Sequence, residues 1–84
     1  MADENDFNMT AVSSSQIAAV GFNAETGQGR VEFLAKGNRG PSLYEYDNCT
    51  QDEATQIING AIGGSVGITF GQLWKGTKNF RRIS

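Results

Sequence analysis

The segment that decides the fold is TQDEATQIINGAIGG, residues 50–64. Thr50 and Glu53 have the spacing of a capping box, in which each side chain accepts a hydrogen bond from the backbone amide of the other residue. Apolar side chains follow at the helical spacing i, i+3, i+4, i+7 and form one stripe. The glycine pair 63–64 is expected to end the helix, because glycine readily takes the left-handed conformation found there. The segment therefore predicts an amphipathic helix that packs on a sheet through Ala54, Ile57, Ile58 and Ala61.

The sheet is predicted from three runs that precede this helix. Residues 17–22 form a short apolar run typical of a buried strand, and residues 30–33 alternate between polar and apolar side chains, as a half-buried strand does. The Asn and Gly residues between them, at 23–29, indicate a hairpin turn. Residues 43–46 follow a turn-rich loop and alternate again. Three strands with short connections predict an antiparallel meander.

Two more elements complete the expected domain. Ser65 can cap a second helix, whose apolar stripe reaches Trp74. Residues 79–83 alternate and are predicted to return as a fourth strand. We therefore expect an α+β fold, with a small antiparallel sheet of three to four strands packed against two helices. It forms a single domain at residues 12–84, preceded by a flexible N-terminal arm at residues 1–11.

The composition is typical of a small globular domain. The chain has 84 residues, of which 38% are hydrophobic and 19% charged, which fits one domain with a thin core. Chains of this size commonly gain stability by oligomerisation, so we expect a homo-oligomer. No apolar run approaches the roughly 18 residues that span a bilayer, and residues 1–8 lack the features of a signal peptide. Together with a single cysteine, Cys49, these features predict a cytoplasmic protein without a membrane partner.

The residue types argue against catalysis. The sequence contains no histidine, which removes the commonest general base and the commonest metal ligand. The carboxylates show no paired spacing that indicates a metal or hydrolytic site. The glycines at 63–67 match neither the phosphate-loop nor the dinucleotide-binding motif, so no cofactor is expected. We therefore expect a binding module rather than an enzyme, with no catalytic residues and no metal.

Several segments together resemble a known family. Val12-Ser13-Ser14 before the first strand, Tyr44-Glu45-Tyr46, the capped helix, Ser65-Val66-Gly67 and the closing aromatic and basic strand occur in an order that is similar to the KTSC domain. That domain is named for its place at the C-terminus of some lysyl-tRNA synthetases, and it also occurs as a lone small protein of phages and bacteria. The resemblance covers residues 12–83 and implies an RNA-related or nucleotide-related role.

The chain departs from the family pattern at one place. In the family an alanine directly precedes the Ser-x-Gly motif, whereas here residues 62–64 separate Ala61 from Ser65. The turn between the two helices is therefore expected to differ from the family's turn.

The candidate binding residues include hydroxyl groups from three segments. Tyr44 and Tyr46 are expected on one face of their strand, where they could stack on a base or hold a ligand by their hydroxyls. The alternative is that both rings pack under a helix. Ser13 and Ser14 before the first strand, and Ser65 at a helix start, could bind a phosphate. The alternative for these serines is an ordinary turn and an N-cap.

Cations form the second candidate set. Four of the seven Lys and Arg residues lie in the last ten positions. If the C-terminal strand pairs with the sheet, Arg81 or Arg82 could face the tyrosines and clamp a phosphate or stack on a base. The alternative is a solvated edge that prevents aggregation. The cationic candidates are Lys75, Arg81 and Arg82 near the C-terminus, and Arg30 and Arg39 on the hairpin and loop.

The charge balance bears on the kind of ligand. A formal net charge of −2 and a pI of about 4.9 argue against a general binder of long nucleic acid. A few local cations can still neutralise one compact phosphate ligand. We therefore expect a non-enzymatic protein that captures a nucleotide or cyclic nucleotide immune signal, as anti-defence sponges of phages do. The alternatives are an RNA-binding module associated with tRNA or ribosomal RNA, a nucleotide-degrading enzyme and a protein–protein adaptor.

Overall fold

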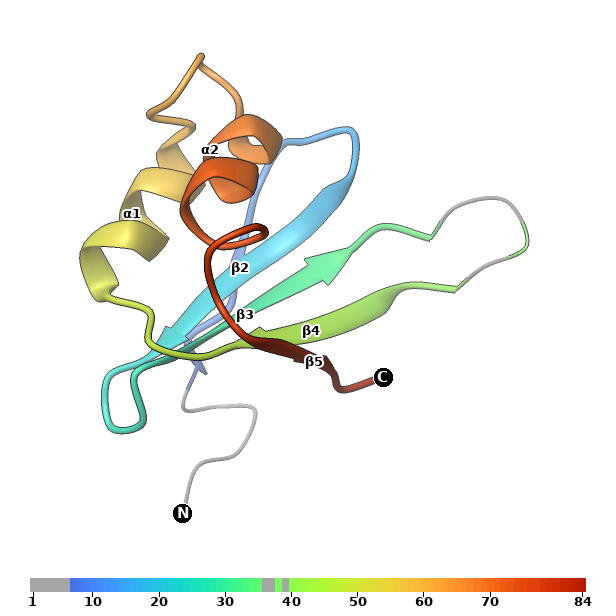
Figure 1. Ribbon diagram of the computed structural model, residues 1–84. Coiled ribbons are helices and arrows are strands. Elements are labelled where there is room, and N and C mark those ends of the chain that lie inside the picture. Colours follow the sequence, from blue (N-terminus) through green and yellow to red (C-terminus); the bar gives the residue numbers. More distant parts are fainter. Residues whose placement is uncertain (1–6, 36–37, 39) are drawn as a thin grey trace.

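The computed structural model describes residues 7–35, 38 and 40–84. Both helices cover one face of a five-stranded antiparallel sheet (Figure 1). The strands lie in the order β1-β2-β3-β4-β5, so each strand pairs with its neighbours in the sequence. No described helix combines the length and apolar character needed to cross a membrane. The α+β fold is thus confirmed; its elements are β1 (Thr10–Ala11), β2 (Ile17–Asn23), β3 (Gln28–Phe33), β4 (Ser42–Tyr46), α1 (Gln51–Asn59), α2 (Val66–Leu73) and β5 (Phe80–Arg82).

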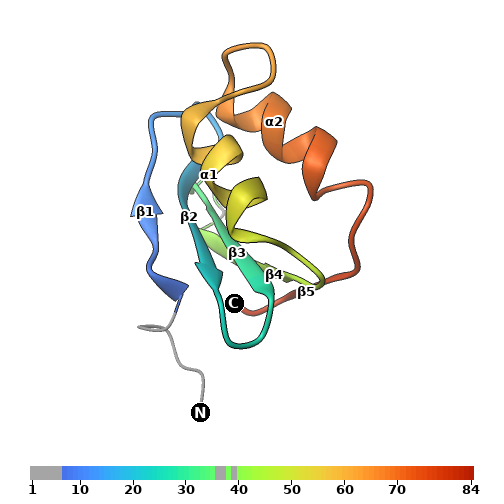
Figure 2. The same cartoon turned by 90° about the vertical axis from the view of Figure 1, so that its left-hand side faces the viewer.

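The sheet has one strand more than the sequence predicts. The additional strand β1 lies at the edge beside β2 (Figure 2). Thr10 and Ala11 pair with Val20 and Ala19, and upstream of them Phe7 is buried. The segment expected to be a flexible arm is therefore structured between residues 7 and 11, while residues 1–6 lie outside the described part.

Helix α1 begins as predicted and ends earlier. The Thr50 hydroxyl accepts a hydrogen bond from the Glu53 amide at 3.1 Å, and the Glu53 carboxylate accepts one from the Thr50 amide at 2.9 Å. The helix ends at Asn59, because Gly60 takes the left-handed conformation with a φ of 61°. The prediction that the glycine pair 63–64 ends the helix is wrong. Ala61 consequently lies in the turn rather than on the helix.

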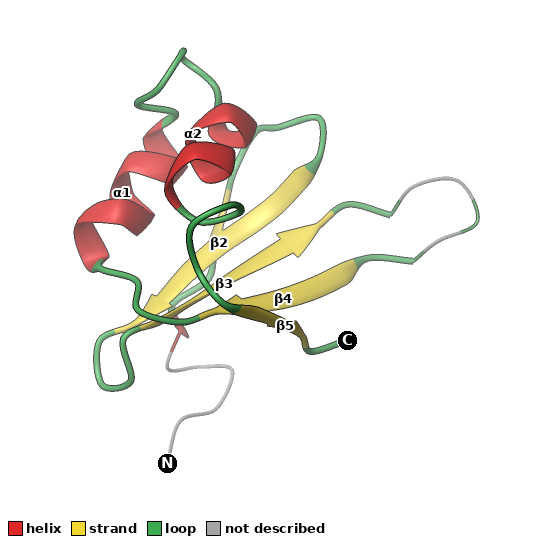
Figure 3. Ribbon diagram, in the orientation of Figure 1, coloured by secondary structure: helices red, strands yellow, loops and turns green. Residues whose placement is uncertain are grey.

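The two helices lie over one face of the sheet (Figure 3). Trp74 is fully buried in the core of the domain. Its ring lies directly on Gly29 of β3, where a Cβ atom would overlap the indole. Tyr46 of β4 stacks on the indole with ring centroids 5.8 Å apart. The indole N–H donates to the Glu53 carboxylate of α1 at 3.3 Å. One side chain thereby connects the central strands, the first helix and the end of the second.

Tyr46 belongs to this core rather than to the surface. Its side chain is 3% exposed and packs edge-to-face against Phe70 at 5.4 Å. Burial raises the pKa of Tyr46 to about 12, because the phenolate would lose its hydration. Burial also raises the pKa of the nearby Cys49 thiol to about 11.

The opposite face of the sheet carries a row of charges. Arg30, Glu45 and Arg81 are direct cross-strand neighbours on β3, β4 and β5. Glu45 is 6% exposed and contacts Arg30 at 3.0 Å and Arg81 at 2.9 Å. The Arg30 guanidinium also lies 4.1 Å from the centre of the Phe7 ring. The buried carboxylate is therefore neutralised from both sides, as a buried charge requires.

We predict that Gly29→Ala lowers the free energy of unfolding by about 1–3 kcal/mol, because the added methyl group must displace the Trp74 ring. Urea unfolding followed by Trp fluorescence measures the change. The matched control is Gly71→Ala on α2, where a Cβ atom meets open space. That control should raise stability by about 0.5–1 kcal/mol, as an alanine replacing a helical glycine does. An unchanged urea midpoint for Gly29→Ala would show that the indole does not depend on this close approach.

We also predict that Tyr46→Phe reduces the loss of stability at alkaline pH. The pKa of Tyr46 is about 12 in the folded chain and 10.0 for the ordinary side chain. The unfolded state therefore releases this proton first, so the contribution of Tyr46 is complete below about pH 10 and declines as pH rises toward about 12. Phenylalanine has no proton to lose. Urea midpoints should fall less steeply for the variant across this range, and parallel pH profiles would contradict a buried hydroxyl.

Candidate ligand-binding site

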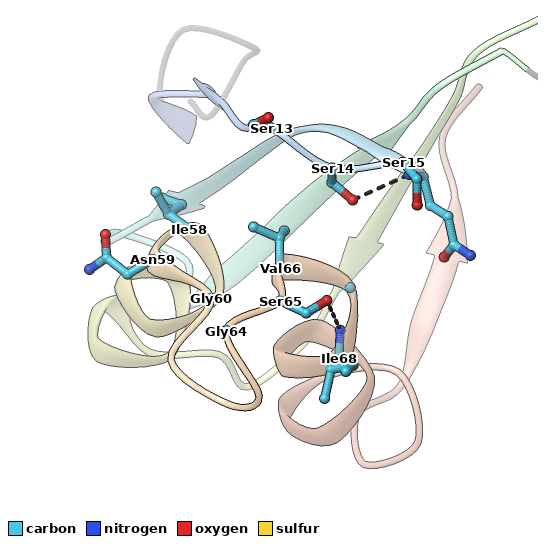
Figure 4. Close-up of a pocket in the computed structure, with 12 residues that line it drawn as sticks. Ser13, Ser14, Ser15, Ile58, Asn59, Gly60, Gly64, Ser65, Val66 and Ile68 are labelled. Carbon is cyan, nitrogen blue, oxygen red and sulfur yellow. Dashed lines mark hydrogen bonds between the residues drawn. The ribbon is translucent and has the colours of Figure 1, made fainter.

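Two hollows lie along the loop that connects β1 to β2, and both are lined by Ser15 and Gln16. The serine hollow, of about 690 Å³, lies between this loop, the end of α1 and the start of α2 (Figure 4). Its lining consists of Ser13, Ser14, Ser15, Gln16, Ile58, Asn59, Gly60, Gly64, Ser65, Val66, Gly67 and Ile68. The aromatic hollow, of about 470 Å³, is lined by Ser15, Gln16, Phe33, Leu34, Ala35, Gly40, Ser42, Tyr44, Lys75 and Phe80.

Ser14 shapes the loop above the serine hollow. Its hydroxyl oxygen accepts hydrogen bonds from the amides of Gln16 at 3.2 Å and Ile17 at 3.3 Å. Both bonds use the oxygen, so the hydroxyl proton stays available to a ligand. Figure 4 shows the Ser14 hydroxyl on the side of the loop that faces Val66, whereas the Ser13 side chain points away from it.

The start of α2 forms the opposite wall. The Ser65 hydroxyl oxygen accepts a hydrogen bond from the Ile68 amide at 3.2 Å, and the Ser65 carbonyl accepts the Thr69 amide at 3.0 Å. The amides of Val66 and Gly67 have no acceptor within the described part of the chain. Free amides at a helix start, together with the positive end of the helix dipole, favour a bound anion.

Thr69 fixes the turn between the helices. Its buried hydroxyl accepts the Ile62 amide at 2.9 Å and donates to the Ser65 carbonyl at 2.8 Å. These bonds hold the turn against α2 and thereby position Gly64 and Ser65 at the rim of the serine hollow. Sequence reasoning missed Thr69, because only the folded turn reveals what its hydroxyl bridges.

The aromatic hollow contains one predicted aromatic residue and one that was missed. Tyr44 is half-buried and packs edge-to-face on Phe33 at 5.6 Å. Phe80 of β5 lies 5.9 Å from Tyr44 and is 60% exposed. Alternation placed Phe80 on a strand, but only the structure shows that α2 leaves its ring uncovered. Lys75 lines the same hollow as Tyr44.

The remaining predicted site residues lie elsewhere. Tyr46 is in the core, so the predicted tyrosine pair is divided between the core and a hollow. Arg30 and Arg81 lie on the opposite face of the sheet in ion pairs with Glu45. Of the two arginines that could face the tyrosines, Arg81 therefore does not, whereas Arg82 is the register partner of Tyr44. Side chains along β5 alternate between the two faces of the sheet, and Arg81 lies on the same face as its register partner Glu45.

Two more candidates lie outside the hollows or outside the described chain. Arg82 pairs in register with Tyr44 but is exposed and lines neither hollow. Arg39 lies outside the described residues.

Arg81 also contacts Asp47 at 3.1 Å. Hydrogen bonds from Gln28 and Arg81 hold the pKa of the Asp47 carboxyl below its ordinary value.

The described residues contain no group of three or more Cys, Asp or Glu side chains that could hold a metal ion. The functional groups that the hollows offer are hydroxyls, amides, aromatic rings and one ammonium group. Such groups can bind a phosphate and a planar ring by hydrogen bonding and stacking.

Comparisons with known proteins bear on the fold. No family model matches the sequence, and no curated protein matches it. Among solved structures, the chain is similar to the crystal structure of the KTSC domain protein YPO2434 from Yersinia pestis. The two sequences are 22% identical, the match covers 93% of this chain and 99% of the other, and the TM-score is 0.71. The chain therefore has the fold of the KTSC domain, as the order of its sequence motifs predicted.

Proposed function

We propose that this is a non-enzymatic binding protein that captures a small phosphate-containing ligand, a nucleotide or cyclic nucleotide of the kind used as an immune signal. One observation carries the proposal. Ser14 and Ser65, which are far apart in the sequence, line one hollow beside the free amides of Val66 and Gly67. Hydroxyl protons and amides that converge on one space are the groups that hold a phosphate.

The charge of the serine hollow favours a phosphodiester. Among the described residues, those that line this hollow include no Lys, Arg, Asp or Glu. A phosphodiester carries one negative charge, which the two amides and the helix dipole can stabilise. A terminal phosphate approaches two charges at neutral pH, and its second charge would lack a cation among the lining residues. Cyclic nucleotides, whose phosphates are diesters, therefore suit the hollow better than nucleoside monophosphates.

The cations support a compact ligand over RNA. Arg30, Arg81 and Lys78 each contact a carboxylate, at distances of 2.9–3.4 Å. Cations that are already paired release few counterions when nucleic acid binds, so they add little to its affinity. Lys75 and Arg82 have no carboxylate partner in the described part of the chain. Lys75 lines the aromatic hollow, whereas Arg82 donates to the Ser84 backbone oxygen at 3.1 Å and lines neither hollow. One ammonium group beside the hollows suits one small ligand, which a sponge would hold without turnover.

We predict that a cyclic mononucleotide or cyclic dinucleotide raises the melting temperature, and that Gly67→Asp abolishes the effect. A ligand at a hundredfold excess over its dissociation constant adds about 2.7 kcal/mol of stability. The aspartate would repel the phosphate, yet a carboxylate in the first turn of a helix stabilises the free protein. Loss of binding without loss of stability would therefore assign the effect to the hollow. Thermal-shift assays with cyclic nucleotides, nucleoside monophosphates and short RNA test this.

The charge-matched control is Gly71→Asp on the same helix, which lines neither hollow. It should bind like the unaltered chain. If no nucleotide shifts the melting temperature, or if both variants lose binding equally, the proposed use of the helix start is wrong.

We further predict a shallow salt dependence. Capture of one phosphodiester should give a slope of log K against log salt of about −1 or smaller in magnitude, whereas RNA that contacts several cations gives a slope of about −0.7 per phosphate contacted. Titration calorimetry at several salt concentrations measures the slope for a cyclic nucleotide and for a short RNA. Tighter binding of RNA with a steep slope would favour the RNA-binding alternative.

A further inference from the structure

One aromatic ring that lines the aromatic hollow, that of Phe80, is largely exposed to solvent. Phe80 is 60% exposed, and Leu34 beside the same hollow is 45% exposed. Single exposed apolar side chains are normal, but these two line one concave space together with Phe33 and Tyr44. The Phe80 ring is held in place by Tyr44 at 5.9 Å and Tyr46 at 5.6 Å. A fixed ring with an uncovered surface is suited to stacking on another planar ring.

Polar side chains surround this apolar surface. Gln16, Ser42 and Lys75 line the hollow, and their side chains make no hydrogen bond within the described part of the chain. An amide and a hydroxyl offer both donors and acceptors, and the ammonium group adds donors. A nucleobase presents both donors and acceptors around a flat ring, whereas a purely apolar ring would leave these groups without partners. The lining therefore offers a stacking surface together with donors and acceptors for the edge of a base.

The aromatic hollow is joined to the serine hollow by a short wall. Ser15 and Gln16 line both spaces. The Gln16 carbonyl accepts a hydrogen bond from the Leu34 amide at 2.9 Å, which ties the wall to the end of β3. On its other side, Ser14 accepts the amides of Gln16 and Ile17. The wall is thus tied to the end of β3 by one bond and its turn is shaped by Ser14.

We infer that the aromatic hollow is the base subsite of the same ligand: a nucleobase stacks on Phe80 beside Tyr44 while its phosphodiester occupies the serine hollow. This inference rests on the proposed function and specifies its ligand as one that carries an unpaired base next to a phosphodiester. Phe80 supplies the stacking surface, and Gln16, Ser42 and Lys75 supply contacts for the base edge.

The test compares ligands with and without a base. Cyclic AMP and cyclic GMP carry a base and a phosphodiester, whereas dimethyl phosphate carries only the phosphodiester. All three should shift the NMR signals of the Val66 and Gly67 amides, and only the cyclic nucleotides should also shift the Phe80 ring and Lys75. Phe80→Ala should weaken cyclic nucleotide binding about tenfold or more, since stacking on an aromatic side chain contributes that much per base.

Two further variants keep the test interpretable. Phe80→Trp should bind cyclic nucleotides at least as tightly and show fluorescence quenching by the base, because it keeps a stacking ring. Ile83→Ala removes a 41% exposed apolar side chain from the same C-terminal segment, outside both hollows, and should change affinity less than twofold.

The outcomes separate the two ideas. If cyclic nucleotides and dimethyl phosphate shift the same signals, or if Phe80→Ala binds as tightly as Ile83→Ala, the base subsite is wrong while the phosphate site stands. If none of the three ligands shifts the Val66 and Gly67 amides, the phosphate site is wrong and the base subsite falls with it.

Discussion

The contact between the Trp74 indole and the bare backbone of Gly29 is the constraint on which the structure depends. Because Gly29 has no side chain, the indole can lie directly on the backbone of β3. In this position the indole stacks on Tyr46, and its N–H donates a hydrogen bond to the Glu53 carboxylate. The same carboxylate accepts the Thr50 amide in the capping box of α1. Because Trp74 follows α2 directly, this contact also anchors the end of α2. The start of the same helix then lies opposite the β1–β2 loop, and the serine hollow is the space between them.

The two faces of the sheet divide the charged and aromatic residues between them. On the face away from the helices, Glu45 lies between Arg30 and Arg81, so these charges are satisfied within the fold. On the helix-covered face, aromatic rings from β3, β4 and β5 contact one another, and only the ring at the β5 edge is uncovered. The division is compatible with the proposed anion site in a chain with net negative charge, because that site would rely on amides and hydroxyls more than on arginines.

Local signals in the sequence predicted much of the fold and named some of the residues that line the candidate site. The capping box at Thr50 and the alternation in the strands are properties of adjacent residues, and they specified α1 and the meander. The two-residue strand β1 has no such pattern, because backbone pairing alone defines it. The end of α1 at Gly60 was missed because several nearby glycines could serve equally well. The grouping of Ser14 with Ser65, and the pairing of Arg81 with Glu45, depend on tertiary register, which no local pattern encodes.

The order of the strands has a consequence for how the chain reaches its native state. Since each strand pairs with the one next to it in sequence, β1 to β4 can assemble through short loop closures, which are fast. Only the pairing of β5 with β4 must wait for both helices, which lie between these strands in the chain. The proposed stoichiometric capture would require the protein in amounts that match its ligand. A topology that lets most of the sheet form before the C-terminal segment is synthesised would suit that requirement.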